Sequence, residues 1–131
     1  MNEHTVNIRV TYKDTDQMGV VYYSNYLVWF EIARTEFFRE HGMEYKRLET
    51  EDRIFLPVTE AFCRYRAPIR YDDVVQVTVK LSEMKAKRIT FEYEIKKKGK
   101  TTSTGHTKHA FINIEGKVVP IPEKIRSEFL K

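Results

Sequence analysis

Residues 12–42 read YKDTDQMGVVYYSNYLVWFEIARTEFFREHG, a short polar loop that leads into the only long stretch of helical periodicity in the chain. Ser24 suits a helix N-cap and Gly42 a C-terminal glycine, so we predict one helix between them. On a helical wheel, one arc of this helix holds mainly apolar side chains, which predicts a face packed against the rest of the protein. This arc contains Tyr26, Leu27, Phe30, Ala33, Phe37 and Phe38, together with Arg34 and His41. Trp29 projects away from the arc, toward a subunit contact or the surface.

The segments around this helix alternate apolar and polar residues, which is the period of half-buried β-strands. The alternation is strict over 6–12, 75–81 and 89–95, and weaker over 54–65 and 104–114. A short helix is also predicted over 44–48, and a turn after Pro122. We therefore expect an α+β protein, with one long helix against a meander of about five antiparallel strands. Because one helix cannot cover both faces of such a sheet, an oligomer is expected.

Length and composition favour a single domain spanning 1–131, with a formal charge of +4. The lone cysteine, Cys63, has no partner for a disulfide in the chain and lacks the spacing of a zinc site, so it is expected to be a half-buried strand residue. No apolar run is long enough to span a membrane. These features predict a cytoplasmic protein. The modest positive charge suits an anionic small molecule as readily as a nucleic acid.

Several kinds of active site are excluded by the motifs that the sequence lacks. The five glycines form neither a dinucleotide-binding fingerprint nor a P-loop, and no serine sits in a Gly-x-Ser-x-Gly elbow. The histidines His4, His41, His106 and His109 lack metal-ligand spacing, and the last two are predicted on opposite faces of one strand. We therefore expect no metal and no cofactor.

The loop Asp14-Thr-Asp16-Gln-Met18-Gly19 places two carboxylates and a glycine within six residues. One interpretation is turn chemistry, since Asp and Gly stabilise loops without any function. A calcium loop also begins Asp-x-Asp with glycine at its sixth position, but here the fifth residue is Met18 and the twelfth is Asn25 instead of glutamate. The third interpretation is catalytic. Free backbone N–H groups at the start of the following helix could hold an oxyanion while Asp16 attacks or activates water, as acyl transfer requires.

Two blocks of residues carry a resemblance to a known family. The first runs from Tyr12 through Asp14, Asp16, Gly19 and the segment VVYYSNY to Glu31-Ile-Ala-Arg-Thr-Glu36; the second is Tyr65-x-Ala-Pro-x-x-Tyr71-Asp-Asp73. Together they resemble the 4-hydroxybenzoyl-CoA thioesterase family, in particular its branch of Tol–Pal-associated acyl-CoA thioesterases. The resemblance implies a hotdog fold, in which the sheet wraps around the long helix, and dimers that pair into a homotetramer. It also implies active sites between subunits that need no metal or cofactor.

The resemblance assigns roles to individual residues. The family's catalytic carboxylate matches Asp16, as nucleophile or general base, and its oxyanion donor matches the backbone N–H of Tyr23. Glu31 matches an acidic helix position near the site, although a structural ion pair with Arg34 is the alternative. For the phosphates of coenzyme A, the resemblance points to Lys85, Lys87 and Arg88, which could instead form a solvated basic turn.

One departure concerns Tyr23, where members of the Tol–Pal branch commonly carry histidine, so no catalytic histidine is assigned. The predicted function is hydrolysis of a short-chain or aromatic acyl-CoA to the free acid and CoA, with an acyl carrier protein as an alternative donor. A hotdog dehydratase is disfavoured because it would need a histidine in the loop or early helix. The remaining alternative is a non-catalytic basic module that binds an acyl carrier protein or RNA. RNA is disfavoured because the aromatic residues are expected inside the protein, leaving little surface for stacking.

Overall fold

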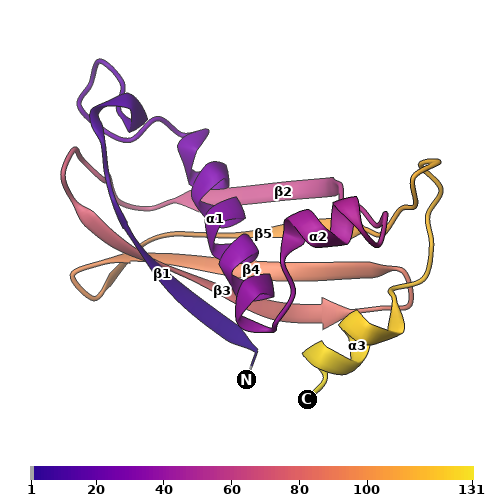
Figure 1. Ribbon diagram of the computed structural model, residues 1–131. Helices are drawn as coiled ribbons and strands as arrows, with labels where there is room; N and C mark the ends of the chain where they lie inside the picture. The colour runs from indigo at the N-terminus through magenta and orange to yellow at the C-terminus, as the bar shows by residue number, and fades with distance from the viewer. Residues whose placement is uncertain (1) are drawn as a thin grey trace.

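The computed structural model describes residues 2–131, which form one antiparallel sheet with helices against it (Figure 1). The elements in chain order are β1 (Glu3–Arg9), a 3-10 turn (Tyr12–Asp14), α1 (Asn25–Glu40), α2 (Tyr45–Thr50), β2 (Val58–Tyr65), β3 (Val74–Met84), β4 (Arg88–Lys97), β5 (Lys100–Ala110) and α3 (Glu123–Phe129). This confirms the α+β class, the single long helix and the five strands. In β3 and β4 the alternate apolar residues are buried on the face that α1 covers, whereas β2 exposes Val58 and Phe62.

The strand order in the sheet is β1-β3-β4-β5-β2, which differs from the expected meander. Strands β3, β4 and β5 do follow one another as in a meander, and β3 pairs antiparallel with β4 through partners such as Val77 and Ile95. Strand β2, however, follows α1 in sequence but pairs with β5 at the far edge. Since α1 crosses the sheet between β1 and β2, the chain reaches the opposite edge before β3 begins.

Helix α1 packs along one face of the sheet, and its buried side chains form the core with the inner residues of β3 and β4. Phe30 stacks on Tyr93 of β4 at 4.2 Å between ring centroids. The ring also lies over Gly105 of β5, where an added Cβ would come within 2.6 Å of it. Glycine at position 105 therefore lets the helix approach the sheet closely.

Two residues of α1 differ from the helical-wheel prediction. Trp29, expected to project outward, is 3% exposed and packs beside Tyr26, while Leu27, expected in the core, is 39% exposed. The helix packs mainly on β1 and β3, so its covered surface is shifted to one side of the predicted arc. An ideal wheel cannot show this shift because it depends on how the sheet curves around the helix.

Arg34 is buried between α1 and the sheet, with no carboxylate within ion-pair distance in residues 2–131. Its Nη1 donates to the Tyr93 hydroxyl at 2.9 Å, and that hydroxyl lies 2.6 Å from the Thr107 hydroxyl. Thr107 in turn contacts Nε2 of His109 at 2.8 Å, and His109 Nδ1 contacts the Leu56 carbonyl at 3.1 Å. With His109 protonated on Nδ1, every group can donate to the next. The chain of hydrogen bonds thus holds the cation by dipoles instead of an opposite charge.

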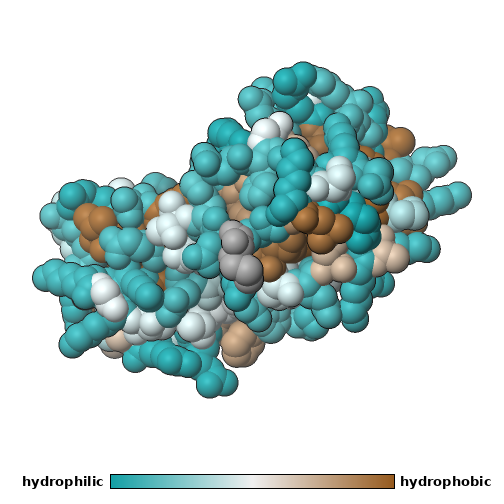
Figure 2. All heavy atoms as spheres, turned by 90° about the horizontal axis from the view of Figure 1, so that it is seen from below, coloured by the Kyte–Doolittle hydropathy of each residue, from teal (hydrophilic) through white to brown (hydrophobic). Residues whose placement is uncertain are grey.

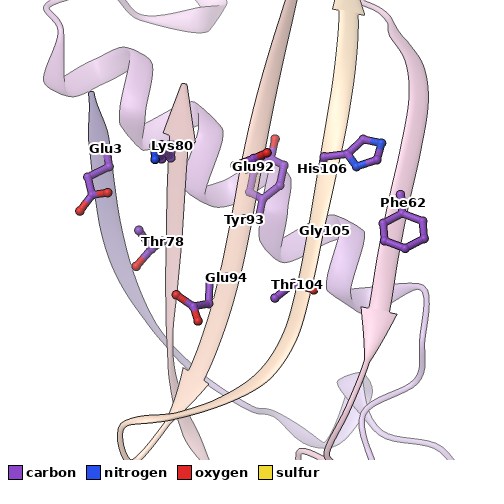
Figure 3. Close-up of a pocket in the computed structure, with 10 residues that line it drawn as sticks. All are labelled: Glu3, Phe62, Thr78, Lys80, Glu92, Tyr93, Glu94, Thr104, Gly105 and His106. Carbon is purple, nitrogen blue, oxygen red and sulfur yellow. The ribbon is translucent and has the colours of Figure 1, made fainter. Parts of the chain in front are cut away.

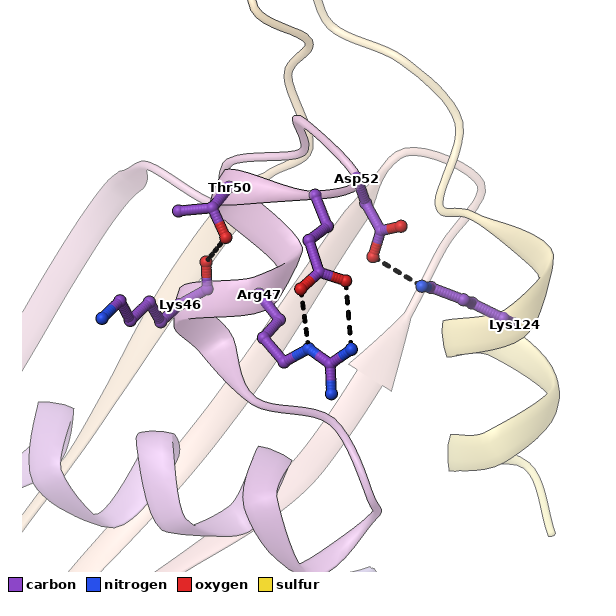
Figure 4. Close-up of polar contacts among 6 residues, drawn as sticks. Lys46, Arg47, Thr50, Asp52 and Lys124 are labelled. Atoms are coloured by element: carbon purple, nitrogen blue, oxygen red, sulfur yellow. Dashed lines mark hydrogen bonds and ion pairs between the residues drawn. The ribbon is translucent and has the colours of Figure 1, made fainter.

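The C-terminal helix α3 is joined to α2 at the end of the sheet far from the loop that follows β1 (Figure 1). Lys124 of α3 forms an ion pair with Asp52, next to the Arg47–Glu51 pair within the α2 segment (Figure 4). Seen from the side where both termini lie, the surface is mostly hydrophilic, with apolar side chains in scattered groups (Figure 2). In the described residues 2–131, no helix is both long and apolar enough to cross a membrane.

Candidate active site

Asp14 organises the loop between β1 and α1. Its side chain is buried and accepts hydrogen bonds from the backbone N–H of Thr11 at 2.9 Å and from the Thr11 hydroxyl at 3.0 Å. Its backbone carbonyl accepts from the N–H of Tyr22 and from the Asn25 side chain, both at 2.8 Å. These contacts join the start of the loop to the start of α1, so Asp14 has the surroundings of a structural residue.

Asp16 begins a tight turn and is only partly buried. Its backbone is fixed by hydrogen bonds with Val20 and Gly19, both at 3.0 Å, and Gly19 has a φ of 80°, which favours glycine. One carboxylate oxygen, Oδ1, accepts from the Met18 N–H at 2.8 Å. The other oxygen, Oδ2, has no donor among residues 2–131 and is free to react.

The segment before β3, which carries the second block of the family resemblance, holds this loop in place. Tyr71 stacks on Tyr12 with ring centroids 4.0 Å apart and planes 5° from parallel. The Val21 N–H donates to the Ile69 carbonyl at 2.8 Å, and Val20 forms a β-bridge with Arg70. The two blocks of the resemblance therefore contact each other in the fold.

The start of α1 offers unused backbone donors. The carbonyl of Tyr22 accepts from the Asn25 N–H at 3.0 Å, which fixes the first turn. Within residues 2–131, the N–H groups of Tyr23 and Ser24 have no acceptor, as expected for the first turn of a helix. Ser24 has a φ of −68° and a ψ of −21°, so it already follows the helical path. Both N–H groups therefore point away from the helix body, where its dipole favours negative charge.

A cavity of about 390 Å³ brings these groups together. Asp16 and the two valines that follow its turn line one part of it, and four tyrosines from the helix start and β2 line another. The residues after β2 complete the lining, which in full is Asp16, Val20, Val21, Tyr22, Tyr23, Tyr26, Tyr65, Arg66, Ala67 and Pro68. The pKa of Tyr22 is raised, first by contact with Tyr23 and in smaller part by the negative charge of Asp16. Burial raises the pKa of Tyr26 and of Tyr65 to about 12, so both hydroxyls stay protonated at neutral pH.

The exposed tyrosines of this cavity correct one expectation. The phenylalanines of α1 and β4 are buried as predicted, but Tyr22, Tyr23 and Tyr65 are exposed around Asp16. Their rings provide a wall against which a flat or apolar group could pack. The arrangement combines a free carboxylate, free N–H donors and an apolar wall, which is the chemistry that acyl transfer uses.

A larger cavity, of about 510 Å³, lies on the other face of the sheet (Figure 3). Its side chains come from all five strands, and acidic and basic residues alternate across neighbouring strands, as in Glu3, Lys80 and Glu92. His106 is paired with Glu60 at 2.7 Å, while His109 faces the core, so the two histidines lie on opposite faces as predicted. This surface contains none of the groups around Asp16.

The sequence model of the thioesterase-like superfamily matches residues 10–129. The chain belongs to this superfamily. The match covers nearly all of the described fold, including both blocks of residues that meet at Asp16. It confirms the family that the two blocks resemble.

Individual members of the superfamily are similar over almost their whole length. The acyl-CoA thioesterase YbgC of Haemophilus influenzae is 32% identical over 98% of this chain and 95% of that protein. The solved structure of a gentisyl-coenzyme A thioesterase is 32% identical, with a TM-score of 0.88 over 94% of this chain and 99% of that one. The crystal structure of protein TT1821 from Thermus thermophilus is 36% identical, with a TM-score of 0.91 over 98% and 95% of the two chains. These similarities confirm the hotdog thioesterase fold.

The structure places the predicted site residues in three groups. Asp16 and Tyr23 line one cavity. Glu31 is exposed on α1 and lines a different cavity together with Arg34. The ion pair that was the alternative for Glu31 is not formed, because the Arg34 side chain turns inward to Tyr93. Lys85, Lys87 and Arg88 lie at the β3–β4 turn, at the end of the sheet opposite the Asp16 loop (Figure 1). The length of β3 separates that turn from the loop by about 33 Å, at about 3.3 Å per residue.

Apart from Asp16 and Tyr23, the residues that line the cavity were not predicted to belong to the site; among them are Tyr26, Tyr65 and Arg66. Tyr65 was part of the resemblance block, but nothing in its local pattern indicated that its side chain would reach the start of α1. Arg66 is the one arginine that lines the cavity, and it was hidden among the many cations of a basic sequence. Cys63 is half-buried nearby, and burial raises the pKa of its thiol, which disfavours a nucleophilic role.

Proposed function

We propose that this protein is an acyl-CoA thioesterase that uses Asp16 as its catalytic carboxylate. The observation that carries the proposal is a cavity lined by both Asp16, whose Oδ2 has no donor among residues 2–131, and Tyr23, whose N–H has no acceptor there, in a member of the thioesterase-like superfamily. Relatives named as acyl-CoA thioesterases support the substrate class. The test is incubation with a panel of acyl-CoAs, with release of the free CoA thiol as the readout.

In the proposed reaction, Oδ2 of Asp16 attacks the thioester carbonyl carbon, and the electron pair of the C=O bond moves to its oxygen. The Tyr23 N–H stabilises this oxyanion. When the oxyanion collapses, the C–S bond breaks and the CoA thiolate leaves, which is easier than expelling an alkoxide because a thiol such as cysteine has a pKa of about 8.5. Water then hydrolyses the acyl–aspartyl anhydride and regenerates Asp16. The same geometry also suits Asp16 as a general base that activates water for direct attack.

The tyrosine wall of the cavity supports an aromatic or short acyl group as the part of the substrate that is bound next to Asp16. Tyr22, Tyr23, Tyr26 and Tyr65 present ring surfaces, and one relative is named for an aromatic substrate, gentisyl-CoA. The panel should therefore compare benzoyl, hydroxybenzoyl and short straight-chain acyl groups. A binding module without catalysis is less well supported, because a free carboxylate at the centre of the cavity would repel nucleic-acid phosphates.

We further propose that the working enzyme is an oligomer that assembles through β2. This strand is the free edge of the sheet beside β5, and it exposes Val58 and Phe62. An exposed apolar edge is a template for another strand, and a second copy of β2 would satisfy both edges at once. If Lys85, Lys87 and Arg88 bind the CoA phosphates, they do so for the cavity of another subunit, since they lie far from Asp16 of their own chain. Because the substrate is a CoA ester and the one cysteine is unpaired, we expect the enzyme to act in the cytoplasm.

A further inference from the structure

Two successive peptide groups at the start of α1 are held in different ways. The Tyr22–Tyr23 peptide is fixed by the 3.0 Å hydrogen bond from the Asn25 N–H to the Tyr22 carbonyl. The Tyr23–Ser24 peptide receives a longer bond within the helix turn, 3.3 Å from the Tyr26 N–H to the Tyr23 carbonyl. Because the C=O and N–H of a trans peptide point in opposite directions, whatever holds the Tyr23 carbonyl also aims the Ser24 N–H.

The Tyr23 carbonyl has a second donor, from a distant part of the chain. The hydroxyl of Tyr65, on β2, donates to it at 3.0 Å. The Tyr65 ring is itself held edge-on against Tyr26, with centroids 4.7 Å apart and planes at 89°. With its pKa raised to about 12 by burial, the hydroxyl remains a donor throughout the neutral range.

We propose that Tyr65 is a positioning residue for thioester hydrolysis, which orients the Tyr23–Ser24 peptide so that the Ser24 N–H joins the Tyr23 N–H in binding the oxyanion. This inference rests on the function proposed above. A hydrogen bond to the carbonyl also polarises the peptide and makes its N–H a stronger donor. Removing a whole oxyanion donor costs about a hundredfold or more in kcat, so loosening one through its carbonyl should cost less, about tenfold.

The substitution Tyr65→Phe tests this role, because it removes the hydroxyl and keeps the ring against Tyr26. Tyr71→Phe is the matched control: Tyr71 is 47% exposed against 46% for Tyr65, and its ring stacks on Tyr12 away from this peptide. With an acyl-CoA that the unmodified enzyme hydrolyses, kcat of Tyr65→Phe should fall about tenfold while KM stays within about twofold. Tyr71→Phe should keep both constants.

A trifluoromethyl ketone analogue of the acyl-CoA separates positioning from a purely structural role, because it forms a tetrahedral adduct that carries an oxyanion. Its inhibition constant should rise for Tyr65→Phe by the same factor by which kcat falls. A lower melting temperature with unchanged kcat and unchanged inhibition would overturn the proposal. If the unmodified enzyme hydrolyses no acyl-CoA, the proposed function fails and this inference fails with it. An active enzyme that is indifferent to Tyr65→Phe overturns the inference alone.

A second variant covers the case in which Tyr65→Phe does not fold. Site-specific replacement of Tyr65 by 3,5-difluorotyrosine keeps the ring and the hydroxyl but makes the hydroxyl ionise at a lower pH. Its kcat should match that of the unmodified enzyme at acidic pH and fall as the hydroxyl ionises and stops donating. A pH profile identical to that of the unmodified enzyme would count against Tyr65 as a positioning residue.

Discussion

The two aspartates of the loop are close in sequence but have different surroundings. Asp14 accepts hydrogen bonds through its Oδ2 and its backbone carbonyl, and these bonds hold the loop together. Asp16 accepts only through Oδ1 of its side chain, so its Oδ2 has no donor among residues 2–131. Asp16→Asn preserves shape and removes the charge, so kcat should fall by at least about a hundredfold with little change in KM. Steady-state kinetics on the best acyl-CoA would measure this, after mass spectrometry has excluded deamidation back to aspartate.

Asp14→Asn is the control for this substitution. Its hydrogen bonds with Thr11 would weaken, which should lower the free energy of unfolding by about 1 kcal/mol and reduce the rate only modestly. If Asp16→Asn turned over substrate nearly as fast as the unmodified enzyme, Asp16 would not be the catalytic carboxylate, and both aspartates of the loop would be structural residues.

At the same scale, His109 makes stability depend on pH. Burial first, and the charge of Arg34 second, lower its pKa to about 4 from the ordinary 6.5. Between these values the unfolded chain binds a proton on His109 that the folded protein does not, so folding becomes less favourable as the pH falls. The loss should approach about 3 kcal/mol near pH 4. Denaturant unfolding from pH 7 to pH 4 would measure it, and His109→Gln should show a shallower pH dependence; an equally steep one would contradict this assignment.

At the scale of elements, the packing of α1 on the sheet depends on the absence of a side chain at Gly105. An added Cβ would lie 2.4 Å from the Phe62 carbonyl oxygen and 2.6 Å from the Phe30 ring. Gly105→Ala should therefore push the helix and β2 apart and lower the free energy of unfolding by about 1–3 kcal/mol. Thr104→Ala, whose side chain is on the opposite face, is the control. Equal melting temperatures for the two variants would show that the helix can shift at no cost.

For the whole molecule, the proposed assembly rests on the exposed edge of β2. Replacing Val58 and Phe62 together by lysine places charges on this edge, which should prevent pairing while leaving the fold intact, since both side chains are exposed. Sedimentation should then show a monomer. Under the proposed assembly, activity should also fall, because the cavity would lose the Lys85, Lys87 and Arg88 of another subunit. A monomer at micromolar concentration with full activity would contradict assembly through β2.

Sequence alone determined the elements and pointed to the loop that carries Asp16. Alternation and helical periodicity depend on neighbours within a few residues, so the strands, the helix 24–42 and the α+β class could be predicted from them. The two blocks around Asp16 and Tyr71 indicated the family through their residue types and spacing.

Tertiary structure decided everything that depends on residues far apart in the chain. Strand β2 pairs with β5. The packing of the whole sheet against α1 selects this pairing, and no local sequence pattern indicates it. The same packing buries Trp29, exposes Leu27, and separates the basic turn at Lys85 from the Asp16 loop by the length of β3. It also brings Tyr65 to the carbonyl of Tyr23, 42 residues earlier. A hydrogen bond across that separation is possible only once the sheet has formed, since closing such a loop costs entropy that a single contact cannot repay.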